Sequence, residues 1–283
     1  MADDRRYGLD DLRRYATDLA VGLGVLPVRA SALASRLLWF DAAGAAPFGI
    51  ATLPALLDRF ESGEIDAKSE GAVISERTGT VVLDGRKGVP LLVLDRAGGL
   101  ATEKARDSGV GLVRVSNVGA VGSAAVIAAE MAVGPTAALL VGPGPVWAVA
   151  LPGAGGLPAV HDPSLVGRQA SQAKPGKSAK PSPPEPEPLA ALWAQLLAGD
   201  GGWLVAAYTV TAQESLAGFF GRLSEPFRGL VGREGVLLPE PWEVRRREAR
   251  ERGLAIAPSG WKALGQWAER LGVAPPEPLD GGR

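Results

Sequence analysis

Residues 111–151 read GLVRVSNVGAVGSAAVIAAEMAVGPTAALLVGPGPVWAVAL, and after Val115 this stretch contains a single charged residue, Glu130. Glycine and proline divide the apolar run into pieces of strand and helix length. The pattern predicts a strand, an apolar helix and then two fully buried strands, at Gly111–Val115, Gly122–Val133, Ala137–Val141 and Val146–Leu151. Strands that alternate with helices are typical of a layered α/β or α+β domain.

The residues before this stretch predict helices followed by a hairpin. Apolar residues at three- and four-residue spacing indicate amphipathic helices, and Thr52 is a plausible N-cap for the third of them, which Gly63 ends. The expected elements are helices at Asp10–Leu23, Val28–Trp39 and after Thr52, strands at Ala72–Glu76 and Thr80–Leu83, and a helix at Leu94–Ser108.

Residues 164–188 read SLVGRQASQAKPGKSAKPSPPEPEP and contain few apolar and no aromatic residues. Such a segment buries too little surface to offset its chain entropy, so we expect a disordered linker. It separates residues 1–163, a helical segment plus a sheet domain, from residues 189–283, which we expect to pack back on the N-terminal helices.

The part after the linker predicts one strand among helices. The helix from Ala212 is expected to bend or break near Pro226, and Ser259 is expected to cap the last helix, which stops at Gly272. The other elements are a short helix at Leu189–Ala198, an alternating strand at Trp203–Tyr208 and a charged helix at Glu243–Arg252.

Composition excludes several classes of protein. The net charge of −1 argues against a nucleic-acid partner, and the charges of Arg245–Arg252 interleave with glutamates, as on a solvated helix face. The absence of Cys excludes disulfides and thiolate metal sites, and one His excludes any site with two imidazoles, so no metal site is expected. We expect a cytoplasmic protein without a membrane span, because Met1–Tyr15 lacks an apolar signal region and the apolar run is cut too short.

Two local patterns could carry chemistry. Ser116-Asn117, followed by Gly119 and Gly122, joins a strand to an apolar helix, an arrangement suited to an anion at a helix N-terminus; an ordinary strand-to-helix connection is the alternative. His161-Asp162 could be an acid–base pair, but adjacent residues rarely point at one substrate atom, which favours a polar loop pair.

The order of several segments resembles the malate/L-lactate dehydrogenase family, the NAD(P)-dependent group with a non-Rossmann fold. The matching segments are 42–58 (AAGAAPFGIATLPALLD), 103–109 (EKARDSG), 113–122 (VRVSNVGAVG), 142–158, 189–199 and 236–273. The resemblance implies that fold, with helical N- and C-terminal segments packed with a central sheet domain. It also implies truncation of the sheet domain, because the family carries a longer stretch where residues 164–188 stand.

The resemblance also implies cofactor and partner expectations. NAD or NADP would be the cofactor, and the implied contacts are Ser116, Asn117, Gly119, Gly122, Pro143 and Pro145. Family members form homodimers with the cofactor between subunits, so we expect a homodimer or association with an active paralogue.

The chain departs from the family at its reactive positions. The family's Ser-His-Gly-x-x-Arg motif, with a catalytic His and a substrate-binding Arg, falls on Pro47, Phe48, Gly49 and Thr52. A second His of the family, at the strand–helix junction, is replaced by Val118. The resemblance therefore assigns no catalytic residue here and implies a catalytically degenerate family member.

Two other functions remain open at this point. The first is an active oxidoreductase on a 2-oxo or 2-hydroxy acid that draws on Arg86, Lys87, His161 and Tyr208. The second is a scaffold or membrane-associated module built on the apolar residues 115–160.

Overall fold

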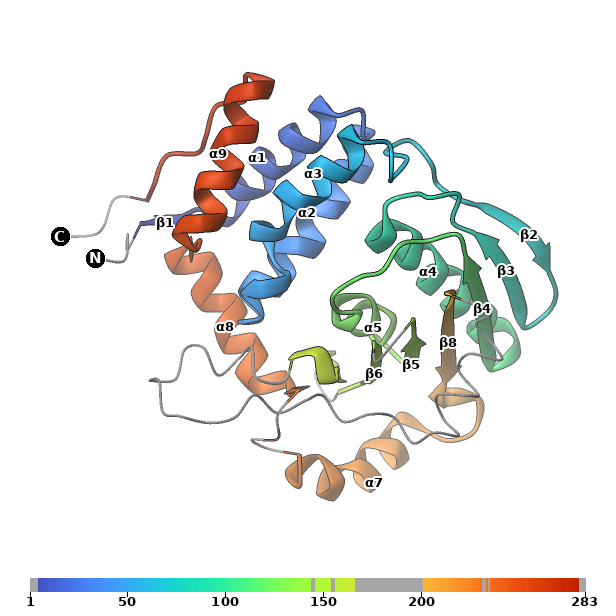
Figure 1. Cartoon of the computed structure of the whole chain (residues 1–283). Helices are drawn as coiled ribbons and strands as arrows, with labels where there is room; N and C mark the ends of the chain where they lie inside the picture. The colour runs from blue at the N-terminus through green and yellow to red at the C-terminus, as the bar shows by residue number, and fades with distance from the viewer. Residues whose placement is uncertain are drawn as a thin grey trace, which may run out of the picture. The chain divides into compact units, whose positions relative to one another are not determined.

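The computed structural model describes residues 5–143, 146–153, 156–165, 201–230, 233 and 235–279 of the chain. The chain divides into two compact units. Figure 1 colours the chain by residue number, from blue at the N-terminus to red at the C-terminus. Unit 1 contains Met1–Lys68 and Glu240–Arg283, and unit 2 contains Ser69–Pro239. Glu240–Arg283 therefore fold with the N-terminal helices, whereas the described residues 201–239 belong to unit 2.

Unit 1 is helical, and its core lies between amphipathic helices. Leu12 and Leu19 of the first helix are fully buried, as is Leu33 of the second, against which it packs. Figure 1 shows the N-terminal helices beside the last helix. The elements are β1 (Arg6–Tyr7), α1 (Leu9–Gly22), α2 (Pro27–Ala42), η1 (Ala46–Phe48), η2 (Ile50–Thr52), α3 (Leu53–Glu61), α8 (Pro239–Arg252), β10 (Leu254–Ala255) and α9 (Pro258–Leu271).

The expected helices of unit 1 are confirmed, and Thr52 occupies the N-cap position of α3, whereas the expected cap at Ser259 is wrong. Thr52 precedes α3, yet its hydroxyl donates to the carbonyl of Gly49 at 2.8 Å and makes no cap hydrogen bond. Ser259 lies inside the first turn of α9, because Pro258 begins that helix and Ala257 occupies the N-cap position. Proline at the first helical position favours this earlier start.

Unit 2 is built around an eight-stranded, mostly antiparallel sheet with the order β2-β3-β4-β8-β5-β6-β7-β9. Among the described strands, β3 and β4 form the parallel pair, joined by α4. The strands are β2 (Ala72–Glu76), β3 (Thr80–Asp84), β4 (Val110–Ser116), β5 (Thr136–Val141), β6 (Trp147–Leu151), β7 (Ala159–His161), β8 (Trp203–Thr209) and β9 (Val236–Leu237). The helices are α4 (Pro90–Ser108), α5 (Ala125–Met131), η3 (Pro163–Leu165), η5 (Val210–Ala212) and α7 (Leu216–Arg228).

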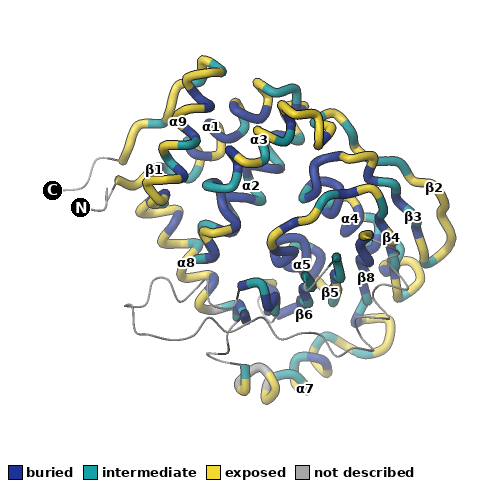
Figure 2. The backbone as a smooth tube through the Cα atoms, viewed as in Figure 1, coloured by how far each residue is buried: buried dark blue, intermediate teal, exposed yellow. Residues whose placement is uncertain are grey.

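The core of unit 2 lies between the sheet and the helices α4 and α5. Val113 and Val115 of β4 are fully buried beneath α4, and α5 is almost entirely buried, as Figure 2 shows. The prediction that β5 and β6 are fully buried is wrong, because burial alternates along both strands and Leu139 of β5 is 38% exposed. The sequence of these strands is apolar throughout, so it does not show which face is covered by a helix. In the structure α5 contacts β5 and β6.

Other boundaries of unit 2 also differ from the sequence-based prediction. α5 begins at Ala125 and not at Gly122, and α7 continues through Pro226 to Arg228, so the predicted break is wrong. β8 follows the expected linker in the chain and pairs with β4 and β5 in the middle of the sheet.

Several expectations fall on residues 166–200, outside the described residues. These are most of the 164–188 linker, the helix at Leu189–Ala198 and the truncation of the sheet domain, which stay predictions. Ser164 and Leu165, at the start of the expected linker, belong to η3, and Leu165 is buried.

Across the described residues, no helix combines the length and the apolar character needed to cross a membrane.

The helix α4 approaches the sheet closely at a glycine of β4. A Cβ on Gly111 of β4 would lie 1.9 Å from the carbonyl oxygen of Ala101 in α4. We therefore expect Gly111→Ala to lower the free energy of unfolding by about 3 kcal/mol or more, because backbone atoms must move apart. Urea unfolding, followed by tryptophan fluorescence, measures the change.

Gly99→Ala is the matched control on the same helix. Gly99 is exposed, and a Cβ there would meet nothing within 4 Å. This variant should be more stable than the parent by about 0.5–1 kcal/mol, because alanine loses less backbone entropy in a helix. Equal losses of stability in the two variants would show that the close contact between Gly111 and Ala101 does not determine how α4 packs on β4.

Candidate functional site

The segment between α2 and α3 places Phe48 in the core of unit 1. Phe48 ends η1, is 8% exposed, and its ring centroid lies 5.6 Å from that of Phe40 in α2. Thr52 ends η2 and donates its hydroxyl to the backbone of the same segment. Both side chains therefore stabilise the local fold by packing and backbone hydrogen bonding.

Asp41, near the end of α2, is an ionisable side chain that forms a hydrogen bond with this segment. Its Oδ2 accepts the N–H of Ile50 at 2.7 Å, and a Cβ on Gly49 would lie 2.1 Å from its Oδ1. Burial raises the pKa of Asp41 to about 7, although the hydrogen bond from Ile50 acts in the opposite direction. The carboxyl group therefore holds the Phe48–Thr52 segment and changes charge near neutral pH.

Sequence analysis did not single out Asp41. A signal was present, since Asp41 is the one charged residue in positions 37–57. A lone charge in an apolar run is expected to find a hydrogen-bonding partner on burial.

In unit 2, the parallel pairing of β3 and β4 places the expected site residues Ser116 and Asn117 beside the end of β3, at one corner of the sheet. Asp84, the last residue of β3, is in register with Ser116, the last residue of β4. The amide of Asn117 donates to Oδ1 of Asp84 at 3.0 Å, and the N–H of Arg86 donates to the same oxygen at 2.9 Å. These two hydrogen bonds lower the pKa of Asp84, so its carboxylate is ionised at neutral pH.

The backbone at this corner is strained. In the described part of the chain, the non-glycine residues with positive φ are Arg86 (47°), Lys87 (55°) and Asn117 (51°). The three are linked, because the N–H of Lys87 donates to the carbonyl of Asn117 at 2.9 Å. A left-handed conformation costs roughly 1–2 kcal/mol per non-glycine residue, and such strain is concentrated at functional sites.

The helix N-terminus that follows Gly119 and Gly122 is bonded by a carboxylate of the chain itself. Oδ2 of Asp162 accepts the hydroxyl of Ser123 at 2.6 Å and the N–H of Ala124 at 3.1 Å, directly before α5. A buried carboxylate of the chain itself thus occupies the position where an anion was expected. Gly119 is half-buried and Gly122 is exposed, both in the loop that precedes this helix.

His161 and Asp162 do not converge on one point. The His161 ring packs edge-on against Trp147, with 5.0 Å between centroids, and burial lowers the pKa of His161 despite the neighbouring carboxylate. Asp162 instead bonds to Ser123 and to Ser164. The two side chains therefore have different partners in unit 2 and do not form an acid–base pair.

The remaining expected residues do not all lie close to one another. Pro143 is half-buried at the bend after β5, and Pro145 lies outside the described residues. Tyr208 of β8 pairs with Val110 at the opposite end of β4 from Ser116, which is roughly 20 Å along the strand. The alternative set of Arg86, Lys87, His161 and Tyr208 is therefore not brought together.

The raised pKa of Asp41 gives a pH dependence with a definite sign. Asp41 keeps its proton up to about pH 7 in the folded state, whereas the ordinary pKa of an aspartate is 3.8. The contribution of Asp41 to stability is therefore full below pH 4, falls as the pH rises toward 7, and is lost above it. The total loss is up to about 4 kcal/mol.

Asp41→Asn should remove this dependence, because an amide oxygen still accepts the N–H of Ile50 and cannot ionise. Compared with the parent, the variant should have a higher free energy of unfolding at pH 8 and a similar one at pH 4. Asp58→Asn, at an exposed position of α3, serves as the control in the same urea titrations. A parent and an Asp41→Asn variant with parallel pH profiles would contradict the assignment.

Comparisons of the sequence and of the structure with known proteins agree on one family. The family model of malate/L-lactate dehydrogenases matches residues 8–162. A curated malate dehydrogenase from Pyrococcus abyssi is 32% identical over 128 residues, which is 44% of this chain and 35% of that protein. The matched region thus spans about a third of the length of this curated relative.

Solved structures share the fold. Malate dehydrogenase from Pyrococcus horikoshii OT3 superposes with a TM-score of 0.76 and 19% identity, covering 99% of both chains. Sulfolactate dehydrogenase from Methanocaldococcus jannaschii gives 0.76 and 19%, covering 95% of this chain and 98% of the other. Because the family model covers more than half of the 283 residues, the chain belongs to the malate/L-lactate dehydrogenase family.

Proposed function

We propose that this family member has lost the chemistry of hydride transfer to 2-oxo acids and acts by self-association or by pairing with an active paralogue. The observation that carries the proposal is Phe48. It stands where the family resemblance implies a catalytic His, and its ring is buried against Phe40.

The reaction needs two groups that the Phe48–Thr52 segment does not supply. Reduction of a 2-oxo acid requires a proton donor beside the carbonyl and a cation for the carboxylate. The benzyl side chain of Phe48 donates no proton, and the hydroxyl of Thr52 carries no charge for a bidentate contact. Loss of a general acid alone costs about 10²–10⁴-fold in rate.

Asp41 does not replace the missing donor in this proposal. Its carboxyl accepts the N–H of Ile50 and packs against Gly49, so it acts on the backbone of the segment. A residue that holds its own segment in this way is a positioning residue.

NAD or NADP is the cofactor that family membership suggests. The described residues that fit its anionic part are those of the corner in unit 2, where Asn117, Arg86 and Lys87 are exposed. When bound, the nicotinamide would supply the hydride, and the chain's own residues would bind and orient it. A corner with exposed cationic side chains, together with the absence of a proton donor at Phe48, favours a binding role over a catalytic one.

An activity screen of the purified full chain tests the loss of chemistry. With 2-oxo acids and either NADH or NADPH, we expect no turnover above background. Turnover of a specific 2-oxo acid at an ordinary rate of about 1–10³ s⁻¹ would refute the proposal. Such turnover would instead support the alternative function, an active oxidoreductase that uses other residues.

Size-exclusion chromatography with light scattering tests the partner role. We expect a mass twice that of one chain, because the family resemblance implies homodimers. Quenching of tryptophan fluorescence in a parallel NADH and NADPH titration would show whether a cofactor binds. A monomer that persists at about 100 μM, well above typical dimer dissociation constants, would exclude self-association.

A further inference from the structure

The sheet of unit 2 has two faces, and the strand register assigns each residue to one of them, because directly opposed residues share a face. Val113, Val205 and Leu140 are opposed across β4, β8 and β5, and all three are fully buried. The helix α4 contacts β4 and β8, α5 contacts β5 and β6, and the two helices contact each other. This first face is therefore closed by α4 and α5.

The second face is also apolar, but its residues are less deeply buried. Leu112, Ala206, Leu139 and Val149 form one row across β4, β8, β5 and β6. Leu139 is 38% exposed, and the other three are half-buried. An antiparallel sheet that faces water on one side normally carries polar residues there. A row of apolar residues therefore indicates that another part of a protein packs on this face.

The chain enters this sheet at β8, which lies in the middle, between β4 and β5. The residues before it, 166–200, lie outside the described residues, and their sequence predicts a helix at Leu189–Ala198. Residues 199–202 (GDGG) allow at most about 18 Å between Ala198 and Trp203, the first residue of β8. A helix joined so closely to a central strand has the sheet within reach, and the first face is already occupied.

The predicted helix has an apolar side that needs a partner. Large apolar residues recur in it at three- and four-residue spacing, which places them on one side of a helix. We call them the apolar stripe, and they are Leu189, Leu192, Trp193, Leu196 and Leu197. The stripe and the second face are thus two apolar surfaces that the chain connects by a short segment.

The size of the second face fits one helix better than a second copy of the chain. The four strands of the row are together about 15 Å wide and 20 Å long. A helix of ten residues is about 15 Å long and 10 Å across, so it covers most of this area. A stable dimer buries roughly 800 Å² on each partner, which is more than twice the area of the face.

We infer that the second face of the sheet is the docking surface for residues 189–198 of this chain, which pack on it through the apolar stripe. The sheet then lies between helices on both faces, as in layered domains. The second face is in that case not available to another copy, so the partner role proposed above must use a different surface. The inference does not depend on the loss of catalysis, and the two can fail separately.

Cysteine labelling of the full chain tests the docking, because the chain has no Cys of its own. Ala206→Cys places one thiol on the second face, and we expect a maleimide to modify it slowly. Leu192→Gln with Leu196→Gln in the same chain should raise the rate about tenfold or more, since burial of two leucines contributes more than that factor. Ala191→Gln with Ala194→Gln, off the stripe, is the matched control and should leave the rate unchanged.

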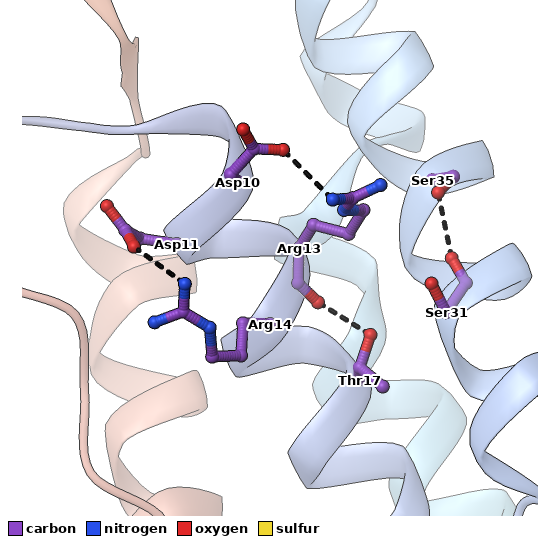
Figure 3. A network of polar contacts seen from close by, with 7 residues as sticks. All are labelled: Asp10, Asp11, Arg13, Arg14, Thr17, Ser31 and Ser35. Atoms are coloured by element: carbon purple, nitrogen blue, oxygen red, sulfur yellow. Dashed lines mark hydrogen bonds and ion pairs between the residues drawn. The ribbon is translucent and has the colours of Figure 1, made fainter.

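Arg14→Cys in unit 1 gives the reference rate for an uncovered thiol. Arg14 is exposed on α1 and pairs with Asp11 at 3.6 Å, as Figure 3 shows. An exposed ion pair contributes little to stability, so this variant should fold as the parent does and react quickly. Labelling of Ala206→Cys at this reference rate, or equal acceleration by both pairs of glutamines, would overturn the inference.

Crosslinking gives a second measurement that does not depend on how the glutamines affect folding. A short bismaleimide should join Ala206→Cys to Leu192→Cys or to Leu196→Cys within one chain, as peptide mass spectrometry identifies. It should not join Ala206→Cys to Val133→Cys, since Val133 is 61% exposed in the connection that follows α5. Crosslinks that form only between two chains would assign the second face to another copy, and no crosslink to either leucine position would count against docking.

Discussion

The close packing of α4 on β4 is the constraint on which unit 2 depends. Gly111 leaves no room for a Cβ beside the carbonyl of Ala101, so the helix lies directly on the strand. Because α4 connects β3 to β4, this contact also fixes the parallel register in which Asp84 is opposite Ser116. The geometry of the strained corner is thus a consequence of how closely one helix approaches one strand.

Local pattern was sufficient to predict most elements, and long-range contacts explain most of the errors. The hairpin of β2 and β3 was predicted because turn residues separate two short apolar runs. The start of α5 was predicted too early, because the carboxylate that precedes it comes from Asp162, 38 residues away from Ala124. The place of β8 in the middle of the sheet has the same origin, since strand pairing is not encoded in the strand's own sequence.

The candidate sites were predictable to different degrees. The substitutions at Phe48 and Thr52 are visible in the sequence once the family resemblance is seen. The role of Asp41 is not, because its raised pKa results from burial that only the packed segment creates. The left-handed backbone of Arg86 and Lys87 is equally hidden, since such conformations are expected at glycine or asparagine.

Under the proposed loss of catalysis, the Phe48–Thr52 segment is a catalytic position of the family that has acquired a structural role. A catalytic imidazole has to remain accessible to substrate, and that requirement limits how far its neighbours can enclose it. Phe48 is free of the requirement, and its ring contributes instead to the apolar contacts around Phe40. Asp41 completes the change by bonding the backbone that follows. If the proposed loss of catalysis is correct, replacing Phe48 with a histidine would bury a polar ring and still leave Thr52 without a positive charge, so one substitution would not be enough to restore activity.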